Sequence, residues 1–268
     1  MEFAAEQCPG GLLHCTIMSE QESGCRICRD GEALPFAISM AFQPIVQASA
    51  REVFAYEALV RGPAGEPAAG VFEQVNQGNR YAFDQACRIR AIECAAAAGM
   101  QTYLSINFMP NAVYEPERCI QTTLATARKA DFPMERLIFE ITEGERIDEP
   151  DHLNDIIRYY QSQGFLTAID DFGAGYAGLG LLADFRTDLV KLDMNLVRDI
   201  DQREGRQSIA RATLAVCRDL NIRAIAEGVE TRAELDTLRA MGIDLFQGYL
   251  LARPAFEQLP EVDWSVLD

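Results

Sequence analysis

Histidine is almost missing from this sequence: its 268 residues include only His14 and His152. His152 lies at the start of a predicted helix. So few imidazoles disfavour a Ser-His-Asp triad and any mechanism with histidine as the general acid or base. Carboxylates, amides and lysine are therefore the candidate chemical groups.

Basic residues are also few, since 24 Lys and Arg stand against 41 Asp and Glu, a formal net charge of −17. This charge repels the backbone of long nucleic acids and the surface of anionic membranes. We therefore expect no nucleic acid polymer and no membrane as a partner. A phosphate-containing substrate would need another source of positive charge, and divalent cations are the natural candidate.

Long apolar runs are missing too, because no run reaches the length of about 18 residues that spans a bilayer. The first residues, Met1–Glu6, are acidic and lack the basic start of a signal peptide. These absences predict a cytoplasmic protein with reduced cysteines. A G-x-G-x-x-G motif after the first strand is also missing, which disfavours a dinucleotide-binding fold.

Half of the eight cysteines fall in the first 28 residues: Cys8, Cys15, Cys25 and Cys28. Cys25 and Cys28 form a C-x-x-C pair, which could supply half of a zinc site. The other half, Cys8 with Cys15 or His14, lacks the tight spacing of a zinc ribbon. A structural Zn²⁺, a redox role and a loosely ordered arm therefore stay open as alternatives for this segment.

Residues 1–36 show no sustained helical or strand periodicity of apolar residues. We interpret them as a Cys-containing extension that precedes one main domain, residues 37–268. The domain begins with two strand-like segments, 40–46 and 53–60, which a short turn makes antiparallel. Residues 62–70 are expected to form a loop. Helical and strand-like segments then alternate, with helices expected near 81–98, 116–129, 151–163, 176–185, 205–220 and 231–241 and strands near 102–107, 137–142, 166–170, 189–192, 223–226 and 245–250.

Repeated strand–helix units of this length predict a mostly parallel sheet that is buried on both faces. About eight strands favour closure into a barrel. The expected fold is therefore α/β, a (β/α)8 TIM-like barrel with one antiparallel strand. Thr231 and Glu234 have the spacing of a capping box at the start of the last helix.

One stretch organises the rest, because the apolar run Leu166–Ile169 stops at two adjacent carboxylates, Asp170 and Asp171. Neighbouring acids at the end of a buried strand repel each other unless a cation neutralises them. The alternative is a helix cap followed by a turn, since Asp is a good N-cap.

Polar residues stand near the carboxyl ends of the other strands as well, and in a barrel all these ends meet on one face. The set is Glu57, Asn107, Glu140, Asp170, Asp171, Lys191, Glu227 and Gln247. Oxygen ligands without Cys or His select Mg²⁺ or Mn²⁺ over zinc. Two such ions can activate a water for in-line displacement at a phosphate. A nearby lysine can orient that water, and Arg61 can reach a phosphate with its bidentate fork.

Glu57-Ala58-Leu59-Val60-Arg61 resembles the signature of the EAL family of cyclic di-GMP phosphodiesterases. The resemblance covers about Ala37–Pro254, and it continues through the segments Gln43–Ile45, Ser105–Asn107, Phe139–Glu143, Asp170–Gly173, Lys191–Asp193, Glu227–Glu230 and Gln247–Tyr249. It implies a barrel enzyme that cleaves cyclic di-GMP to linear pGpG with two Mg²⁺ or Mn²⁺ ions and is inhibited by Ca²⁺.

The resemblance also implies roles for individual residues. By the family pattern, one metal is bound by Glu57, Asn107, Glu140 and Asp170, and the second is faced by Asp170 and Asp171. Glu227, also a candidate metal ligand, and Lys191 handle the attacking water, with Glu227 as general base, so the catalytic set is Glu227, Lys191 and Glu57. Substrate contact or support of the site falls to Gln43, Leu59, Arg61, Asp193, Glu230 and Gln247.

The family also couples dimer formation to activity through the loop after Asp171, so Glu143, Phe172 and Gly173 are candidate coupling residues and a homodimer is expected. The sequence departs from the family pattern at two places. In this loop, residues 175–179 read GYAGL, where the family usually has two serines, and after the Asn107 strand Met109 stands where serine is common. A catalytically silent cyclic di-GMP receptor that acts through a protein partner is the alternative function. The complete acid set with Lys191 favours the enzyme.

Overall fold

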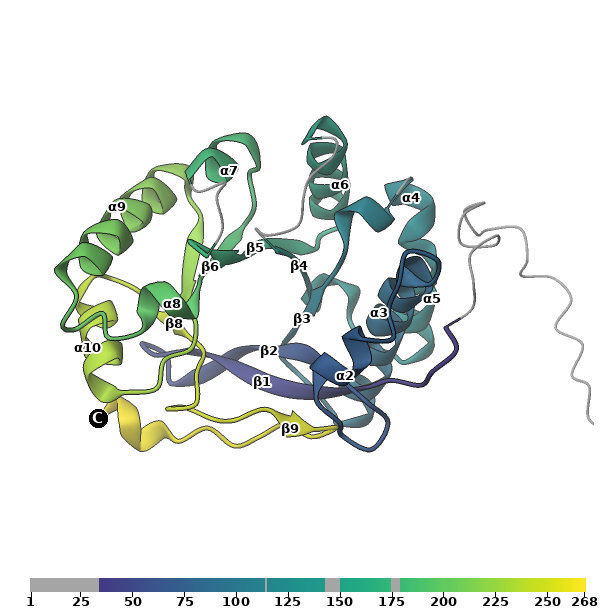
Figure 1. Cartoon of the computed structure of the whole chain (residues 1–268), viewed down its shortest axis with the longest axis horizontal. Coiled ribbons are helices and arrows are strands. Elements are labelled where there is room, and N and C mark those ends of the chain that lie inside the picture. The colour runs from purple at the N-terminus through teal and green to yellow at the C-terminus, as the bar shows by residue number, and fades with distance from the viewer. Residues whose placement is uncertain (1–33, 114, 143–149, 175–178) are drawn as a thin grey trace, which may run out of the picture.

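The computed structural model describes residues 34–113, 115–142, 150–174 and 179–268 as a closed barrel of strands surrounded by helices (Figure 1). The strands follow the order β2-β3-β4-β5-β6-β7-β8-β1, and pairing of β1 with β2 closes the ring. β1 (Ser39–Gln47) runs antiparallel to β2 (Glu52–Arg61) and to β8 (Leu245–Phe246). The predicted TIM-like barrel with one antiparallel strand is confirmed.

The remaining ring strands are parallel to their neighbours: β3 (Tyr103–Asn107), β4 (Leu137–Thr142), β5 (Leu166–Phe172), β6 (Leu189–Leu192) and β7 (Arg223–Ala226). The longer helices are α3 (Arg80–Ala97), α5 (Gln121–Lys129), α6 (Pro150–Ser162), α9 (Glu204–Leu220) and α10 (Arg232–Ala240). Shorter helices are α2 (Ala68–Phe72), α4 (Pro116–Cys119), α7 (Leu179–Asp184) and α8 (Met194–Val197), with 3-10 turns η1 (Pro110–Ala112), η2 (Met134–Arg136) and η3 (Trp264–Leu267). No helix of the described residues is long and apolar enough to cross a membrane.

Several segments differ from the sequence prediction. The predicted loop at 62–70 contains the start of α2, and the predicted helix at 116–129 is divided into α4 and α5 at Ile120. Ile120 keeps helical dihedral angles, φ −77° and ψ −18°, so the division is slight. A further strand, β9 (Ala255–Phe256), pairs with β1 and was not predicted.

The predicted strand at 245–250 ends after Phe246, because the following residues pair with the loop after β7 instead. The Val229 amide donates to the Gln247 carbonyl, and the Leu250 amide donates to the Val229 carbonyl, both at 3.1 Å. A Cβ atom on Gly248 would lie 2.0 Å from the Val229 carbonyl oxygen. Only glycine therefore allows this close approach of the two loops.

The interior of the barrel has an apolar layer that supports a polar one. The apolar layer is one packed cluster of buried residues: Ile45, Ala55, Ile138, Ala168, Leu189, Ile225 and Leu245. Because side chains of a strand alternate between its two faces, residues two positions further along each parallel strand, towards its carboxyl end, face the same interior. On the antiparallel β1 the matching position lies two residues earlier, towards the amino end of the strand. Those residues are Gln43, Glu57, Glu140, Asp170, Lys191, Glu227 and Gln247. The strand pattern thus places every one of these polar side chains at a single end of the barrel.

The loop that follows Glu227 is fixed by the capping box of α10, which confirms the prediction. Thr231 Oγ1 accepts from the Glu234 amide at 3.2 Å, and Glu234 Oε2 accepts from the Thr231 amide at 3.0 Å. The same carboxylate accepts from the amides of Glu230 and Asp199, at 3.0 and 2.9 Å. Glu234 is only 1% exposed, so one buried carboxylate joins the β7–α10 loop to the turn after α8.

Replacing Glu234 with alanine is expected to lower the free energy of unfolding by about 2 kcal/mol at pH 7, because three backbone amides lose their acceptor. Burial alone raises the pKa of Glu234, but these backbone hydrogen bonds outweigh it and lower the pKa below 4.5. A carboxyl group whose pKa is lower in the folded state stabilises the protein at any pH above its unfolded-state pKa. This stabilisation is lost as the pH falls through the folded-state pKa. Urea unfolding should therefore show a difference between wild type and variant that shrinks below pH 4.5.

Asp236 supplies the matched control for this prediction. It lies on the same helix and pairs with Arg232 at 2.9 Å, but its side chain is 52% exposed. Asp236→Ala should cost no more than about 0.5 kcal/mol. Equal losses in the two variants would contradict a special role for the buried carboxylate.

Candidate active site

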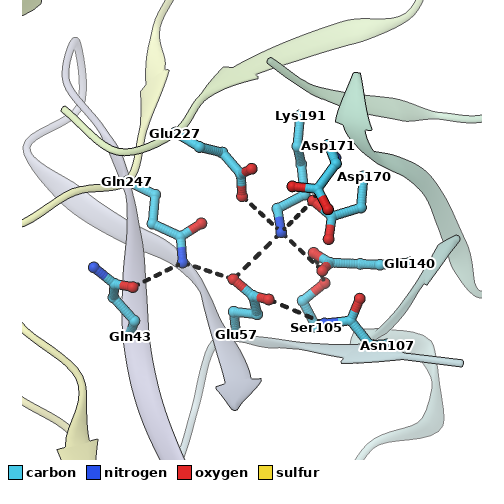
Figure 2. Close-up of polar contacts among 10 residues, drawn as sticks. All are labelled: Gln43, Glu57, Ser105, Asn107, Glu140, Asp170, Asp171, Lys191, Glu227 and Gln247. Atoms are coloured by element: carbon cyan, nitrogen blue, oxygen red, sulfur yellow. Dashed lines mark hydrogen bonds and ion pairs between the residues drawn. The ribbon is translucent and has the colours of Figure 1, made fainter. Parts of the chain in front are cut away.

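Lys191 is the centre of the polar layer, and four carboxylates surround its ammonium group (Figure 2). Its Nζ lies 2.7 Å from Glu227, 2.8 Å from Glu140, 3.0 Å from Asp170 and 3.3 Å from Glu57. The lysine is only 1% exposed. These four acids come from four different strands or strand ends, so the barrel itself, rather than one loop, sets their geometry.

Glu57 is held by donors on both of its oxygens. Asn107 Nδ2 donates to Oε1 at 3.0 Å, and Gln247 Nε2 donates to Oε2 at 2.7 Å (Figure 2). Gln247 Nε2 also lies 3.4 Å from Gln43 Oε1, and Gln43 Nε2 donates to the Ala252 carbonyl at 3.2 Å. Among the described residues, no donor satisfies the buried Oε1 of Gln247. An acceptor is therefore left available inside the site.

Glu140 has a partner that the sequence interpretation did not assign to the site. Ser105 Oγ donates to Glu140 Oε1 at 2.5 Å, while Lys191 holds the other oxygen. Both Ser105 and Glu140 are buried. The available signal was spacing, because Ser105 lies two residues before Asn107 and so faces the same side of β3.

Asp170 and Asp171 both reach the site, although neighbouring residues of a regular strand face opposite sides. The pairing of β5 with β6 shifts register between Ile169 and Phe172, and Asp171 has a left-handed φ of 55°. The Asp171 amide donates to Asp170 Oδ1 at 2.9 Å. This irregularity turns the second carboxylate towards the first, and such strained positions gather at functional sites.

Negative charge exceeds positive charge among these side chains, with five carboxylates around one lysine. Burial raises the pKa of Glu140 and of Glu227, and neighbouring carboxylates add to the effect. Burial, Asp170 and Asp193 together raise the pKa of Asp171 to about 6. Burial lowers the pKa of Lys191, but the surrounding carboxylates outweigh it and raise the pKa well above its usual value. The site is thus short of positive charge.

Two groups of acids have the spacing that a metal ion needs. In each group, Glu57/Glu140/Asp170 and Asp170/Asp171/Glu227, one oxygen per residue lies within 4.8 Å of the others. Asp170 belongs to both groups, so it can bridge two ions. Carboxylate oxygens suit Mg²⁺, Mn²⁺ and Ca²⁺, and two divalent ions would offset the excess negative charge. The residues therefore fit a pair of hard cations.

The predicted substrate residues divide between the site and its surroundings. Gln43 and Gln247 belong to the inner network, while Leu59 and Arg61 line an adjacent cavity of about 450 Å³ that reaches Asp171. Most of the remaining lining is apolar, from residues such as Ala58, Phe72, Phe83 and Ala91. The site therefore opens next to a space large enough for a flat apolar group.

Asp193 and Glu230 are committed to other partners. Asp193 is buried and accepts from the Asn195 amide at 2.9 Å as the N-cap of α8. Glu230 is exposed and pairs with Arg198 at 2.7 Å, outside the network around Lys191. Their predicted contact with substrate stays a prediction.

Of the candidate coupling residues, Phe172 is buried at the end of β5 and Gly173 follows it with a φ of +99°, a conformation that favours glycine. Glu143 lies outside the described residues. So do Cys8, Cys15, Cys25 and Cys28, and the zinc prediction stays a prediction. Within the part of the chain that the structure describes, no disulfide is formed by Cys87, Cys94, Cys119 or Cys217.

Solved structures resemble this chain closely. A standalone EAL protein from Vibrio cholerae, in its c-di-GMP-bound form, is 53% identical, with a TM-score of 0.84 over 87% of this chain and 99% of that one. BlrP1 from Klebsiella pneumoniae, in a manganese/cy-diGMP complex, is 34% identical, with a TM-score of 0.78 over 85% of this chain and 58% of BlrP1.

Curated relatives agree with the structural likeness. The blue light- and temperature-regulated antirepressor BluF of Escherichia coli is 32% identical over 225 residues, which are 84% of this chain and 56% of BluF. Other relatives are named cyclic di-GMP phosphodiesterases. The chain spans only part of the length of these curated relatives: 56% of BluF and 38% of the next relative. A model of the EAL domain matches residues 36–254, and the chain therefore belongs to the EAL domain family.

Proposed function

We propose that this chain hydrolyses cyclic di-GMP to linear pGpG by metal-assisted attack of water on a phosphodiester. The observation that carries the proposal is the acid network around Lys191, in which two groups of carboxylates with metal-binding spacing share Asp170. A site that only bound the nucleotide would not need five carboxylates and a buried lysine at this spacing. The matching relatives and the c-di-GMP-bound neighbours support the same substrate.

Glu57, Asn107, Glu140 and Asp170 would hold one Mg²⁺ or Mn²⁺ ion, and Asp170, Asp171 and Glu227 the second. Such ions, when bound, lower the pKa of a coordinated water and stabilise negative charge on the phosphate oxygens. Inhibition by Ca²⁺ is part of the same proposal. The choice of ion rests on the oxygen-rich donor set and on the manganese complex of BlrP1.

The protein's own groups would orient the water and the substrate. Glu227 is the most exposed of the four carboxylates that contact Lys191, with 13% of its side chain exposed, and it is the candidate general base for the attacking water. Lys191 Nζ, 2.7 Å from Glu227, holds that carboxylate in place and donates hydrogen bonds. The unpaired Oε1 of Gln247 would accept a hydrogen bond from a water or a substrate hydroxyl. Arg61 lines the adjacent cavity, where its guanidinium would bind a phosphate of the substrate. The apolar wall of the same cavity would pack against a base of the nucleotide.

We further propose that the protein works as a homodimer, as the family resemblance implies, with Glu143, Phe172 and Gly173 in the segment that couples the dimer to the site. The substrate is an intracellular messenger, so we place the activity in the cytoplasm. Zn²⁺ binding by the N-terminal cysteines remains a proposal that metal analysis of the purified protein tests.

The BluF likeness favours one second candidate, a catalytically silent receptor that acts through a protein partner. Chromatography of cyclic di-GMP incubated with the purified protein separates the two functions. We expect linear pGpG with Mg²⁺ or Mn²⁺ and none with Ca²⁺ or EDTA. Tight nucleotide binding without product under every cation would reject the enzyme and favour the receptor.

A further inference from the structure

The backbone that leaves β3 after Asn107 is held from two sides. On one side, the Phe108 amide donates to the Glu140 carbonyl of β4 at 3.1 Å. On the other, the Met109 amide donates to Asp84 Oδ1 of helix α3 at 2.9 Å. Asn107, a proposed metal ligand, therefore sits immediately before a segment that is fixed by the sheet and by a side chain of the surrounding helix layer.

Asp84 is a buried carboxylate with a buried cation beside it. It is 3% exposed, and its other oxygen pairs with Arg88, which is 0% exposed and lies one turn further along α3. Arg88 Nη1 lies 3.5 Å from the Tyr160 hydroxyl. The Tyr160 ring in turn packs against Phe108, with centroids 5.5 Å apart. The ion pair thus contacts the segment after Asn107 both directly and through Tyr160.

Stability alone is a poor explanation for this pair. Taking two charges out of water is costly, and well-packed apolar residues in their place are often as stabilising or more so. The carboxylate does one thing that an apolar side chain cannot do, which is to accept from the Met109 amide. That hydrogen bond acts on the chain two residues from Asn107, whose amide group contacts Glu57 at 3.0 Å.

We propose that Asp84 is a positioning residue, which acts through the Met109 amide to hold Asn107 and Glu57 in the geometry that binds metal. The inference rests on the proposed function, because it takes these two residues as metal ligands. Arg88 pairs with Asp84 and holds its carboxylate in orientation within an apolar layer. Residues that hydrogen-bond to metal ligands, or to the backbone beside them, commonly determine the affinity for the metal and the activity.

Two double variants separate the hydrogen bond from the ion pair. Asp84→Asn with Arg88→Met removes both charges but keeps an acceptor for the Met109 amide. Asp84→Leu with Arg88→Met removes both charges and the acceptor, with a side chain of similar size. Titration calorimetry measures the Mn²⁺ affinity of each double variant. For Asp84→Asn with Arg88→Met, we expect an affinity within about threefold of wild type, and for Asp84→Leu with Arg88→Met an affinity weaker by roughly tenfold or more. The Mn²⁺ concentration for half-maximal turnover should shift in parallel.

Equal Mn²⁺ affinities in the two folded double variants would overturn the inference. If both affinities are equally weakened, the charge pair rather than the hydrogen bond is required, and if both equal that of wild type, neither is required. If the Leu variant does not fold, Asp84→Ala with Arg88→Met takes its place, because alanine also lacks an acceptor and suits a helix. A wild-type protein that binds no Mn²⁺ would instead reject the proposed function, which keeps the two failures apart.

Discussion

Glu57→Ala is expected to reduce kcat/KM for cyclic di-GMP by roughly 10³-fold or more. Glu57 contacts three groups of the network at once: Asn107 at 3.0 Å, Gln247 at 2.7 Å and Lys191 at 3.3 Å. Its loss removes a proposed metal ligand and also leaves both amide groups free to turn away. Steady-state kinetics with Mg²⁺ or Mn²⁺, at several metal concentrations, measure the effect.

The fold should survive this change, because one carboxylate fewer reduces the repulsion around the site. We expect the melting temperature of the metal-free protein to change little. Glu52→Ala is the matched control, since Glu52 lies on the same strand, is exposed and is the strand's first residue, away from the carboxyl end. That variant should keep wild-type kinetics. Wild-type turnover in Glu57→Ala would refute the assignment of the active site.

The barrel and the polar layer could be predicted because both follow from short-range pattern. Apolar strands of four to seven residues, separated by helices, require a parallel sheet, and the two-residue period of a strand fixes which side chains share its inner face. Ala55 and Glu57 or Leu189 and Lys191 are such pairs, with the apolar residue in the packed cluster and the polar one above it. Knowledge of strand positions was therefore sufficient to bring together the residues of the site that follow the regular strand period.

Features that depend on irregular backbone or on distant partners could not be predicted. Asp171 was assigned to the site by its place at a strand end and by the family resemblance, but the register shift and left-handed φ that turn it there are not encoded by an alternating pattern. Gly248 ends β8 because another loop approaches within the space of a Cβ atom. Asp84 and Arg88, four residues apart, have the spacing of an exposed helical ion pair. Their burial follows from the neighbouring α6 and β3 segments, which the sequence of α3 does not reveal.

Lys191→Met is the other change with a large expected effect, and here stability and activity both respond. Lys191 is one of only two lysines in the chain, and four carboxylates lie within 3.3 Å of its Nζ. Removing one partner from a buried ionic group costs roughly 3–5 kcal/mol. For a domain of this size, that corresponds to a fall of roughly 10 °C in the melting temperature of the metal-free protein.

Divalent cations should restore much of this loss, because they supply the charge that the variant lacks at the same carboxylates. Mg²⁺ is therefore expected to raise the melting temperature of Lys191→Met by more than it raises that of wild type, as thermal unfolding with Mg²⁺ and with EDTA would show. Turnover should nevertheless stay lost, because methionine cannot hold Glu227 or donate to a water. Lys129→Met, an exposed change of the same charge on α5, is the control and should alter neither property. If Mg²⁺ does not change the melting temperature of Lys191→Met, these carboxylates do not form the metal site.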